Sequence, residues 1–195
     1  AIGRLALFAQ DPASAVDMNN VAVGYVAGQS VTTGINNTLI GGLAGDAITT
    51  GGQNTAVGYQ SLSGGVASYY NTAIGYQALL SDTTGRESVA VGRNALRTQN
   101  DTSSSSTYNT AVGADAGYAV TTGTSNTLIG GLAGDAINTA DDNTAVGKSA
   151  LTTLTTGDDN AAFGAYALQL ATTSNSNTGL GYYALRQTTT GVANT

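Results

Sequence analysis

The stretch NTAVGYQSL at residues 54–62 recurs as NTAIGYQAL at residues 71–79, so that the two copies lie 17 residues apart. Its first five residues occur in closely related forms ten times along the 195-residue chain. The last glycine of these copies stands at Gly24, Gly41, Gly58, Gly75, Gly92, Gly113, Gly130, Gly147, Gly164 and Gly181. Each step between them is 17 residues, except for the 21-residue step from Gly92 to Gly113. Such fixed spacing indicates a repeat protein in which each unit forms one turn of a regular structure.

A second, longer period is superimposed on the first. The stretch NTLIGGLAGDAI occurs unchanged at residues 37–48 and 126–137, which are 89 residues apart. This distance equals four 17-residue units and one 21-residue unit. The chain begins and ends within a unit. We therefore expect residues 1–195 to form a single repeat domain that is a segment of a longer fibre.

Each unit is numbered from its Asn as position 1, which makes the repeated glycine position 5. This glycine, the β-branched residues before it and a Thr-Thr-Gly sequence near positions 13–15 leave no helical period. The pattern fits two short strands better than a helix. The strands are expected at about positions 1–4 and 6–9, with the glycine at the corner between them and a Thr-rich return loop after them. Strands this short need stacking, at about 4.8 Å per turn. The sequence predicts an all-β protein, a parallel β-solenoid of 17-residue coils, whose ten turns are roughly 48 Å long.

The two faces of the first strand are both apolar. Position 4 is always large and apolar, as at Val57, Ile74 and Val91, and we expect it to face the core of the coil. Position 3 then faces the other way. It is mostly Ala, including Ala56, Ala73, Ala90 and Ala111. An apolar second face suggests burial against another part of the coil or against another chain. The small side chains suit close approach of several chains, which makes these alanines candidate trimer contacts.

The repeats resemble those of a known family. Ser88-Val89-Ala90-Val91-Gly92 and Asn20-Val21-Ala22-Val23-Gly24 resemble the repeats of YadA-like head domains in trimeric autotransporter adhesins. The variants at residues 54–62 and 71–79 are also similar to repeats of bacteriophage tail fibres. The resemblance implies a left-handed parallel β-roll and a homotrimer, although YadA-like heads use shorter units.

The composition excludes several classes of function. The chain has no His and no Cys, so it lacks the Ser-His-Asp triad, Cys/His nucleophile pairs and nearly all zinc ligand sets. It carries six basic and twelve acidic residues, a net charge of −6, which argues against nucleic-acid binding. No run of apolar residues is long enough to span a membrane. We expect no enzymatic activity and no cofactor.

Two motifs have alternative functional interpretations. Residues 41–46, repeated at 130–135, resemble a phosphate cradle, but no Lys-Ser/Thr follows them. As a calcium-binding turn they lack a third glycine, because Ala44 and Ala133 stand there. Glycines that relieve crowding at a corner explain them better. The acidic pairs Asp141-Asp142 and Asp158-Asp159 stack one turn apart and are weak candidates for a Ca²⁺ site, against the simpler interpretation of a solvated loop.

Three surface features remain. The tyrosines at position 6 have two interpretations: they contact sugars or a protein partner, or they cover the edges of neighbouring coils. These tyrosines are Tyr25, Tyr59, Tyr76 and Tyr182. The Thr-Thr pairs suggest ice binding, but turn chemistry explains them because they lack a Thr-x-Thr strand pattern. The 21-residue unit inserts polar residues at 102–107, whereas the equivalent loop around Asp11-Pro12-Ala13-Ser14 differs in sequence. Such a loop is either a decoration or a tolerated insertion.

Together these features predict a structural or adhesive shaft. We expect an extracellular, homotrimeric, non-catalytic fibre on a cell surface, with a host-surface glycan or protein as a further partner. The shaft of a bacteriophage tail fibre, a virion fibre with the same physical design, is the alternative. An ice-binding β-solenoid is the third interpretation.

Overall fold

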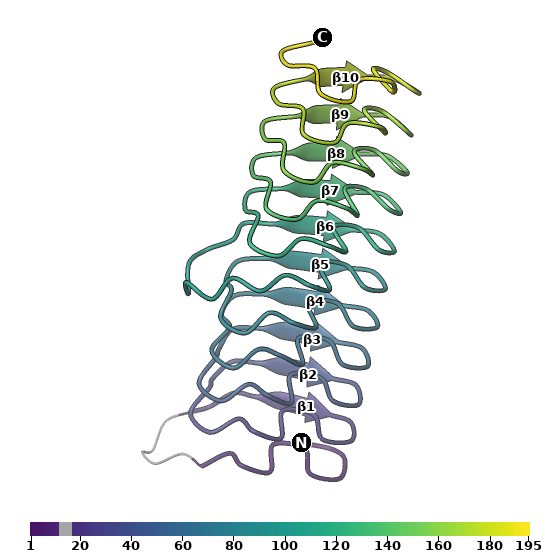
Figure 1. Cartoon of the computed structure of the whole chain (residues 1–195). Helices are drawn as coiled ribbons and strands as arrows, with labels where there is room; N and C mark the ends of the chain where they lie inside the picture. The colour runs from purple at the N-terminus through teal and green to yellow at the C-terminus, as the bar shows by residue number, and fades with distance from the viewer. Residues whose placement is uncertain (12–16) are drawn as a thin grey trace.

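The computed structural model describes residues 1–11 and 17–195 as a rod of stacked coils (Figure 1). The ten strands of the described residues are β1 (Val21–Val23), β2 (Thr38–Ile40), β3 (Thr55–Val57), β4 (Thr72–Ile74), β5 (Val89–Val91), β6 (Thr110–Val112), β7 (Thr127–Ile129), β8 (Thr144–Val146), β9 (Ala161–Phe163) and β10 (Thr178–Leu180). They form one parallel sheet whose strand order is the order along the chain. None of the described residues is helical. The predicted all-β parallel β-solenoid is confirmed.

The 17-residue period sets the register of the sheet. Thr55 pairs with Thr72 and Ala56 with Ala73, so that like residues lie above one another. The ladder continues beyond each strand, because the Gly75 amide donates to the Val57 carbonyl at 2.8 Å. Each coil is therefore bonded to the next through the same set of backbone groups.

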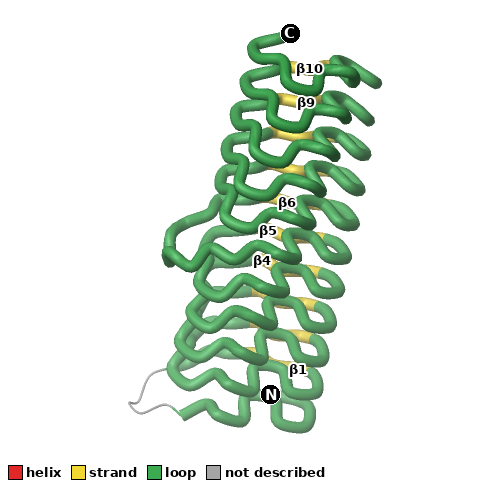
Figure 2. The backbone as a smooth tube through the Cα atoms, viewed as in Figure 1, coloured by secondary structure: helices red, strands yellow, loops and turns green. Residues whose placement is uncertain are grey.

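Each coil contains one strand rather than the two that the sequence suggests (Figure 2). Positions 6–9 were expected to be extended, but they form a turn. The cause is the backbone at positions 7 and 9, which lies in the left-handed region: φ is 54° at Gln77 and 50° at Leu79. Two such residues separated by one other fold the chain back on itself and cannot continue a strand.

The two faces of the strand are the reverse of the expected assignment. Position 3 points into the coil: Ala56, Ala73, Ala90 and Ala111 are all fully buried within the single chain and belong to its core. They are not available as trimer contacts. Position 4 points outward instead, and Ile74 is 38% exposed. Val57, Ile74 and Val91 therefore form an outer column and not the core column.

The volume available inside the narrow coil explains this reversal. Leucines at position 9, such as Leu62 and Leu79, reach inward from the opposite wall and fill the space in front of the small position 3. Where position 3 is Leu39, position 9 is Gly45, and a Cβ on Gly45 would lie 2.7 Å from Leu39 Cδ2. The core therefore accepts a large side chain from one wall or from the other, but not from both.

The corner glycines at position 5 combine an unusual backbone with close packing. Gly75 has φ of 135°, and a Cβ there would lie 2.4 Å from the carbonyl oxygen of Gly92 in the next coil. A side chain at this corner would strain the backbone and separate the coils.

A buried ladder of asparagines runs beside the apolar core. Asn71 is 1% exposed, its Nδ2 donates to the Gly85 carbonyl at 2.8 Å, and its Oδ1 accepts from the Ser88 amide at 2.9 Å. Its own backbone amide donates to Asn54 Oδ1 at 3.0 Å. The Asn at position 1 thus bonds to its own coil and to both neighbouring coils. This role is not predicted from the sequence, although Asn is nearly invariant at this position.

The 21-residue unit adds a protruding loop between β5 and β6 (Figure 1). Residues 102–105 are exposed, and the Ser103 and Ser105 hydroxyls donate to the Asp101 carboxylate at 2.6 and 2.5 Å. The loop therefore closes on itself. Of the equivalent stretch Asp11-Pro12-Ala13-Ser14, residues 12–14 lie outside the described residues.

Candidate functional site

The outer surface of the sheet is formed mostly by Thr, Val and Ile side chains. We call it the strand face; it comprises positions 2 and 4 of every strand, the residues Val21, Val23, Thr38, Ile40, Thr55, Val57, Thr72, Ile74, Val89, Val91, Thr110, Val112, Thr127, Ile129, Thr144, Val146, Ala161, Phe163, Thr178 and Leu180. Ile40, Ile74 and Ile129 are each 38% exposed. A continuous apolar column along a whole rod is larger than the scattered exposed residues of an ordinary surface.

Two loops border the strand face. The post-strand edge is the loop at positions 6–11, and the pre-strand edge is the return loop at positions 13–17. The post-strand edge carries five of the six basic residues, namely Arg4, Arg93, Arg97, Lys148 and Arg186, together with Asp46, Asp115 and Asp135. The pre-strand edge and its counterparts in the N-terminal and 21-residue coils carry Asp11, Asp17, Glu87, Asp101, Asp141, Asp142, Asp158 and Asp159, with Arg86.

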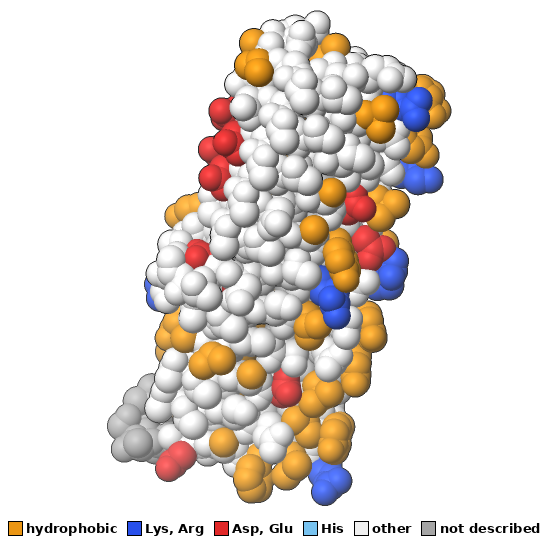
Figure 3. Space-filling model, in the orientation of Figure 1, with side chains coloured by type: hydrophobic (Ala, Val, Ile, Leu, Met, Phe, Trp, Pro, Cys, Tyr) orange, Lys and Arg blue, Asp and Glu red, His pale blue; other side chains and the backbone are white. Residues whose placement is uncertain are grey.

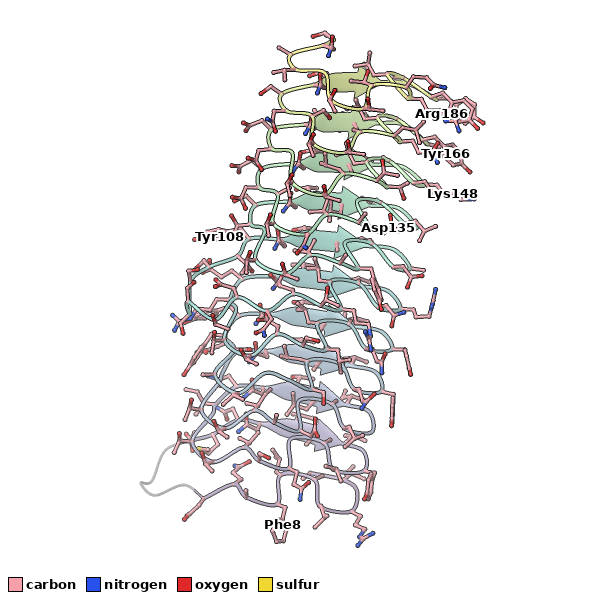
Figure 4. The ribbon with its side chains drawn as sticks, viewed as in Figure 1. Phe8, Tyr108, Asp135, Lys148, Tyr166 and Arg186 are labelled. Atoms are coloured by element: carbon pink, nitrogen blue, oxygen red, sulfur yellow. The ribbon has the colours of Figure 1, made fainter. Side chains whose placement is uncertain are left out.

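Charge is therefore separated across the width of the rod. Figure 3 shows a row of acidic side chains on one long side and most of the basic side chains on the other, where further acidic side chains lie among them. Figure 4 shows Lys148, Tyr166 and Arg186 projecting from the post-strand edge and Tyr108 from the opposite edge. The apolar strand face lies between these two edges.

In the acidic pairs of the pre-strand edge, the carboxylates of Asp141 and Asp158 accept hydrogen bonds from backbone amides. Asp141 Oδ1 accepts from the Thr124 amide at 2.6 Å, and Asp158 Oδ1 accepts from the Asp141 amide at 2.9 Å. Asp142 and Asp159 are exposed. No group of three or more acidic side chains in the described residues is arranged to hold a metal ion. The stacked position-16 carboxylates thus join one coil to the next.

The glycine-rich motif at residues 41–46 serves the packing of the core. Gly45 makes room for Leu39, and Gly134 does the same for Leu128 in the second copy. The Asp46 carboxylate accepts a hydrogen bond from the Ser63 hydroxyl of the next coil. These contacts account for the repeated motif without a bound phosphate or cation.

The position-6 tyrosines stack along the post-strand edge. The rings of Tyr59 and Tyr76 lie 5.8 Å apart and within 15° of parallel. Toward the C-terminus, Tyr166, Tyr182 and Tyr183 form a cluster with ring centroids 4.1 to 6.1 Å apart. The faces of Tyr59 and Tyr76 are turned toward one another, so stacking between coils is their first role.

The Thr-Thr pairs are hydrogen-bonded along the rod. Thr49 Oγ1 donates to the Val66 carbonyl at 3.1 Å, and Thr172 Oγ1 donates to the Thr189 carbonyl at 3.0 Å. These hydroxyls repeat the coil-to-coil bonding of the backbone, as turn chemistry predicts.

A buried polar cluster interrupts the core near the 21-residue unit. Asp82 accepts from the Gly85 amide at 2.9 Å and from Gln99 Nε2 at 3.1 Å, while Gln99 also bonds Ser88. Burial raises the pKa of Asp82 to about 6, against the two hydrogen bonds that favour its carboxylate, and the charge of Asp101 adds a smaller rise. This cluster was not foreseen; the signal was polar side chains at position 12, where Ile48 and Ile137 stand elsewhere.

Comparison of the chain with protein-family models, with curated proteins and with solved structures finds no match. Among the described residues there is no helix long and apolar enough to cross a membrane. The class of protein that the fold defines is a parallel β-solenoid, and the strand face with its two charged edges is its candidate functional surface.

Proposed function

We propose that this protein is the non-catalytic shaft of an extracellular fibre, a stiff rod that spaces or displays an adhesive surface. The observation that carries the proposal is the continuity of the ladder. From β1 to β10 each strand pairs in parallel with its sequence neighbour, and side-chain amides of successive asparagines also bond one coil to the next in the interior. A load applied along the rod is therefore shared among many equivalent bonds.

The assembly that we propose is a homotrimer, following the resemblance to YadA-like heads. The alanine column is buried inside each chain, so the strand face takes its place as the surface between chains. The bacteriophage tail-fibre shaft differs in the particle that carries it and not in this physical design. A host-surface glycan or protein is a further partner of the exposed edges.

Small-angle scattering tests the shaft proposal. The described strands span roughly 48 Å at about 4.8 Å per strand, so the scattering curve should show a rod of constant cross-section at least this long. Limited proteolysis should leave the rod intact and cleave at the exposed loop 102–105. A flexible chain or a compact spherical particle would contradict the proposal.

Ice binding is the second candidate, and one observation favours it. The strand face presents Thr at position 2 and a β-branched residue at position 4 in straight rows, as at Thr55 and Val57 above Thr72 and Ile74. The Thr-Thr pairs are less suitable, because they lie in the return loop and their hydroxyls are bonded to the next coil. Thermal hysteresis of the purified protein that disappears when Thr55 and Thr72 become Lys would favour ice binding over the shaft.

A further inference from the structure

Two tyrosines of the pre-strand edge occupy a backbone conformation that suits their side chains poorly. Tyr70 and Tyr108 stand directly before the position-1 Asn of the next unit, with φ of 59° and 52°. Other coils place Asn36, Asp142 or Asp159 there, residue types that adopt the left-handed region more readily than a bulky aromatic residue does. Residues held in such sparsely populated conformations cluster at sites that bind ligands.

The packing of the coil does not account for these two side chains. Tyr70 is 55% exposed and Tyr108 is 60% exposed. The ring of Tyr70 lies 6.3 Å from that of Tyr69 and is tilted by 42°, whereas Tyr59 and Tyr76 are nearly parallel. Figure 4 shows Tyr108 projecting from the pre-strand edge, next to the protruding loop. Both rings are therefore open to a ligand.

The sheet fixes the spacing of the two tyrosines along the rod. Tyr70 lies two residues before Thr72, where β4 begins. Tyr108 lies two residues before Thr110, where β6 begins. Val89 of β5 pairs with both threonines, so two ladder steps, about 9.6 Å, separate the tyrosines along the rod. This spacing is close to the length of two pyranose rings in an extended sugar chain.

The coil between the two tyrosines supplies polar groups. Glu87 is exposed and lies two residues before β5. The neighbouring Arg86 guanidinium lies over the ring of Tyr69, with its Cζ 5.0 Å from the ring centroid. In the described residues the one ion pair joins Arg93 to Asp115, so no carboxylate neutralises Arg86. The patch thus combines a carboxylate acceptor and a guanidinium donor with two exposed aromatic rings.

We propose that Tyr70 and Tyr108, with Glu87 and Arg86 between them, bind a neutral, β-1,4-linked chain of pyranose sugars that lies along the rod. The two aromatic rings stack on the apolar faces of alternate sugars. Glu87 accepts hydrogen bonds from sugar hydroxyls, and Arg86 donates to them. The inference rests on the proposed function and makes it specific, because it assigns an adhesive glycan site to named residues of the shaft.

The charges of the patch favour a neutral glycan over other ligands. An acidic polysaccharide or a nucleic acid would bring negative charge next to Glu87, on a chain whose net charge is −6. A proline-rich peptide also packs against aromatic rings, but it presents only backbone carbonyls, and a carboxylate such as Glu87 can only accept hydrogen bonds. Sugar hydroxyls donate and accept, so they match both Glu87 and Arg86.

Isothermal titration calorimetry of the whole chain tests the site. The probes are the hexasaccharides of β-1,4-linked glucose, N-acetylglucosamine and mannose, and the control ligand is the α-1,4-linked glucose hexasaccharide, whose chain is curled. At least one β-linked probe should bind, and the curled control should bind more weakly. Tyr70→Ala and Tyr108→Ala should each weaken binding about threefold to tenfold. Tyr108→Phe keeps the ring and should bind as the wild type does.

Tyr76→Ala is the matched control variant. Tyr76 is 49% exposed, but it lies on the post-strand edge with its ring stacked on Tyr59, so its removal should leave sugar binding unchanged. Tyr70→Asn and Tyr108→Asn should lose binding without lowering the midpoint of urea unfolding, because Asn tolerates the left-handed backbone. A lower midpoint would show that the rings are structural and would overturn the inference.

Three other results would also overturn the inference: no binding of any β-linked probe, equal binding of the curled control, or binding that is unaffected by both alanine variants. Binding of a proline decapeptide but of no sugar would assign the patch to a peptide ligand instead. The shaft is tested separately. A rod in the scattering experiment that binds no sugar refutes the glycan site alone, whereas a flexible chain refutes the shaft whatever the calorimetry shows.

Discussion

Asp82 places a titratable carboxyl group inside the coil, and this makes the stability of the rod depend on pH. The side chain is fully buried, and burial raises its pKa from 3.8 to about 6. The informative perturbation is Asp82→Asn, which removes the titration but keeps the shape of the side chain. An Asn at this position keeps an oxygen for the Gly85 amide but sets its NH2 group against Gln99 Nε2, which donates to the other carboxylate oxygen of Asp82. The loss of that hydrogen bond lowers stability by the same amount at every pH, so the pH dependence still reports the titration of Asp82.

The sign of the effect follows from the direction of the pKa shift. Between pH 3.8 and about 6 the folded chain holds a proton on Asp82 that the unfolded chain has lost, so the free energy of unfolding falls as pH rises. The contribution is fully present below pH 3.8 and is lost once pH passes through about 6. A rise from 3.8 to about 6 corresponds to about 3 kcal/mol. Wild-type protein should therefore be less stable near pH 7 than near pH 4 by most of this amount, relative to the variant.

Urea unfolding followed by far-UV circular dichroism, at several values between about pH 4 and pH 7, measures this difference. The comparison with Asp82→Asn is essential because other carboxyls contribute. Burial raises the pKa of Asp135, which acts in the same direction; burial also favours a higher pKa at Asp101, but hydrogen bonds from Ser103 and Ser105 outweigh it and lower that pKa. Both groups are present in both proteins. A difference between wild type and variant that does not change over this range, or that grows in favour of wild type as pH rises, would refute the reasoning.

Three further substitutions test the construction of the coil by thermal or urea unfolding. Gly75→Ala should lower the free energy of unfolding by more than about 2 kcal/mol, because φ is 135° and the new Cβ would meet the next coil. As the control, Gly131→Ala should change it by less than about 0.5 kcal/mol, because only one atom lies within 4 Å of the new Cβ. Equal effects of the two changes would contradict this account. Asn71→Ala should cost about 2 to 4 kcal/mol, since it leaves the Gly85 carbonyl and the Ser88 amide without their partner, and a neutral result would show that water replaces the amide. Leu39→Ala should lower the free energy of unfolding by about 2 to 5 kcal/mol. In that variant, Gly45→Leu should recover part of the loss, so that the combined effect of the two changes differs from the sum of the single effects by more than about 1 kcal/mol. Additive effects would refute the exchange of volume between the two walls.

The period of the sequence predicts the solenoid, the register and the position of the corner glycine, because each depends only on spacing. It does not predict which face of the strand lies inside. A three-residue strand with apolar residues at positions 3 and 4 offers two faces, and hydrophobicity alone favours the larger residue as core. The deciding quantity is the volume on the opposite wall, where Leu62 and Leu79 fill the coil.

The second predicted strand failed for a related reason. Positions 7 and 9 have positive φ in every described coil, although many of these residues, such as Gln77 and Leu79, are not glycine. The strand and turn propensities of such residues do not predict this backbone conformation. A signal is nevertheless present at position 9, which is glycine in four of the ten units, at Gly28, Gly45, Gly117 and Gly134, and leucine in the other six. A position that accepts either glycine or one large apolar residue is typical of a left-handed backbone that faces a core of fixed volume.

Departures from the repeat are compensated by side chains of the same coil and of its neighbours, which allows ten unequal units to keep one register. The asparagine ladder breaks at Ser88, whose hydroxyl is too short to reach the next coil. Gln99 supplies the missing amide: its Oε1 accepts from Asn109 Nδ2 at 2.9 Å, the role that Asn109 Oδ1 plays for Asn126 one coil later. Its Nε2 meanwhile bonds Asp82 and Ser88. The acid at position 12, the serine at position 1 and the glutamine therefore form one polar unit, and changing any of them alone leaves a buried group unpaired. Leu39 is accommodated in a similar way, because glycines make room for it both in the preceding coil, at Gly28, and in its own coil, at Gly45.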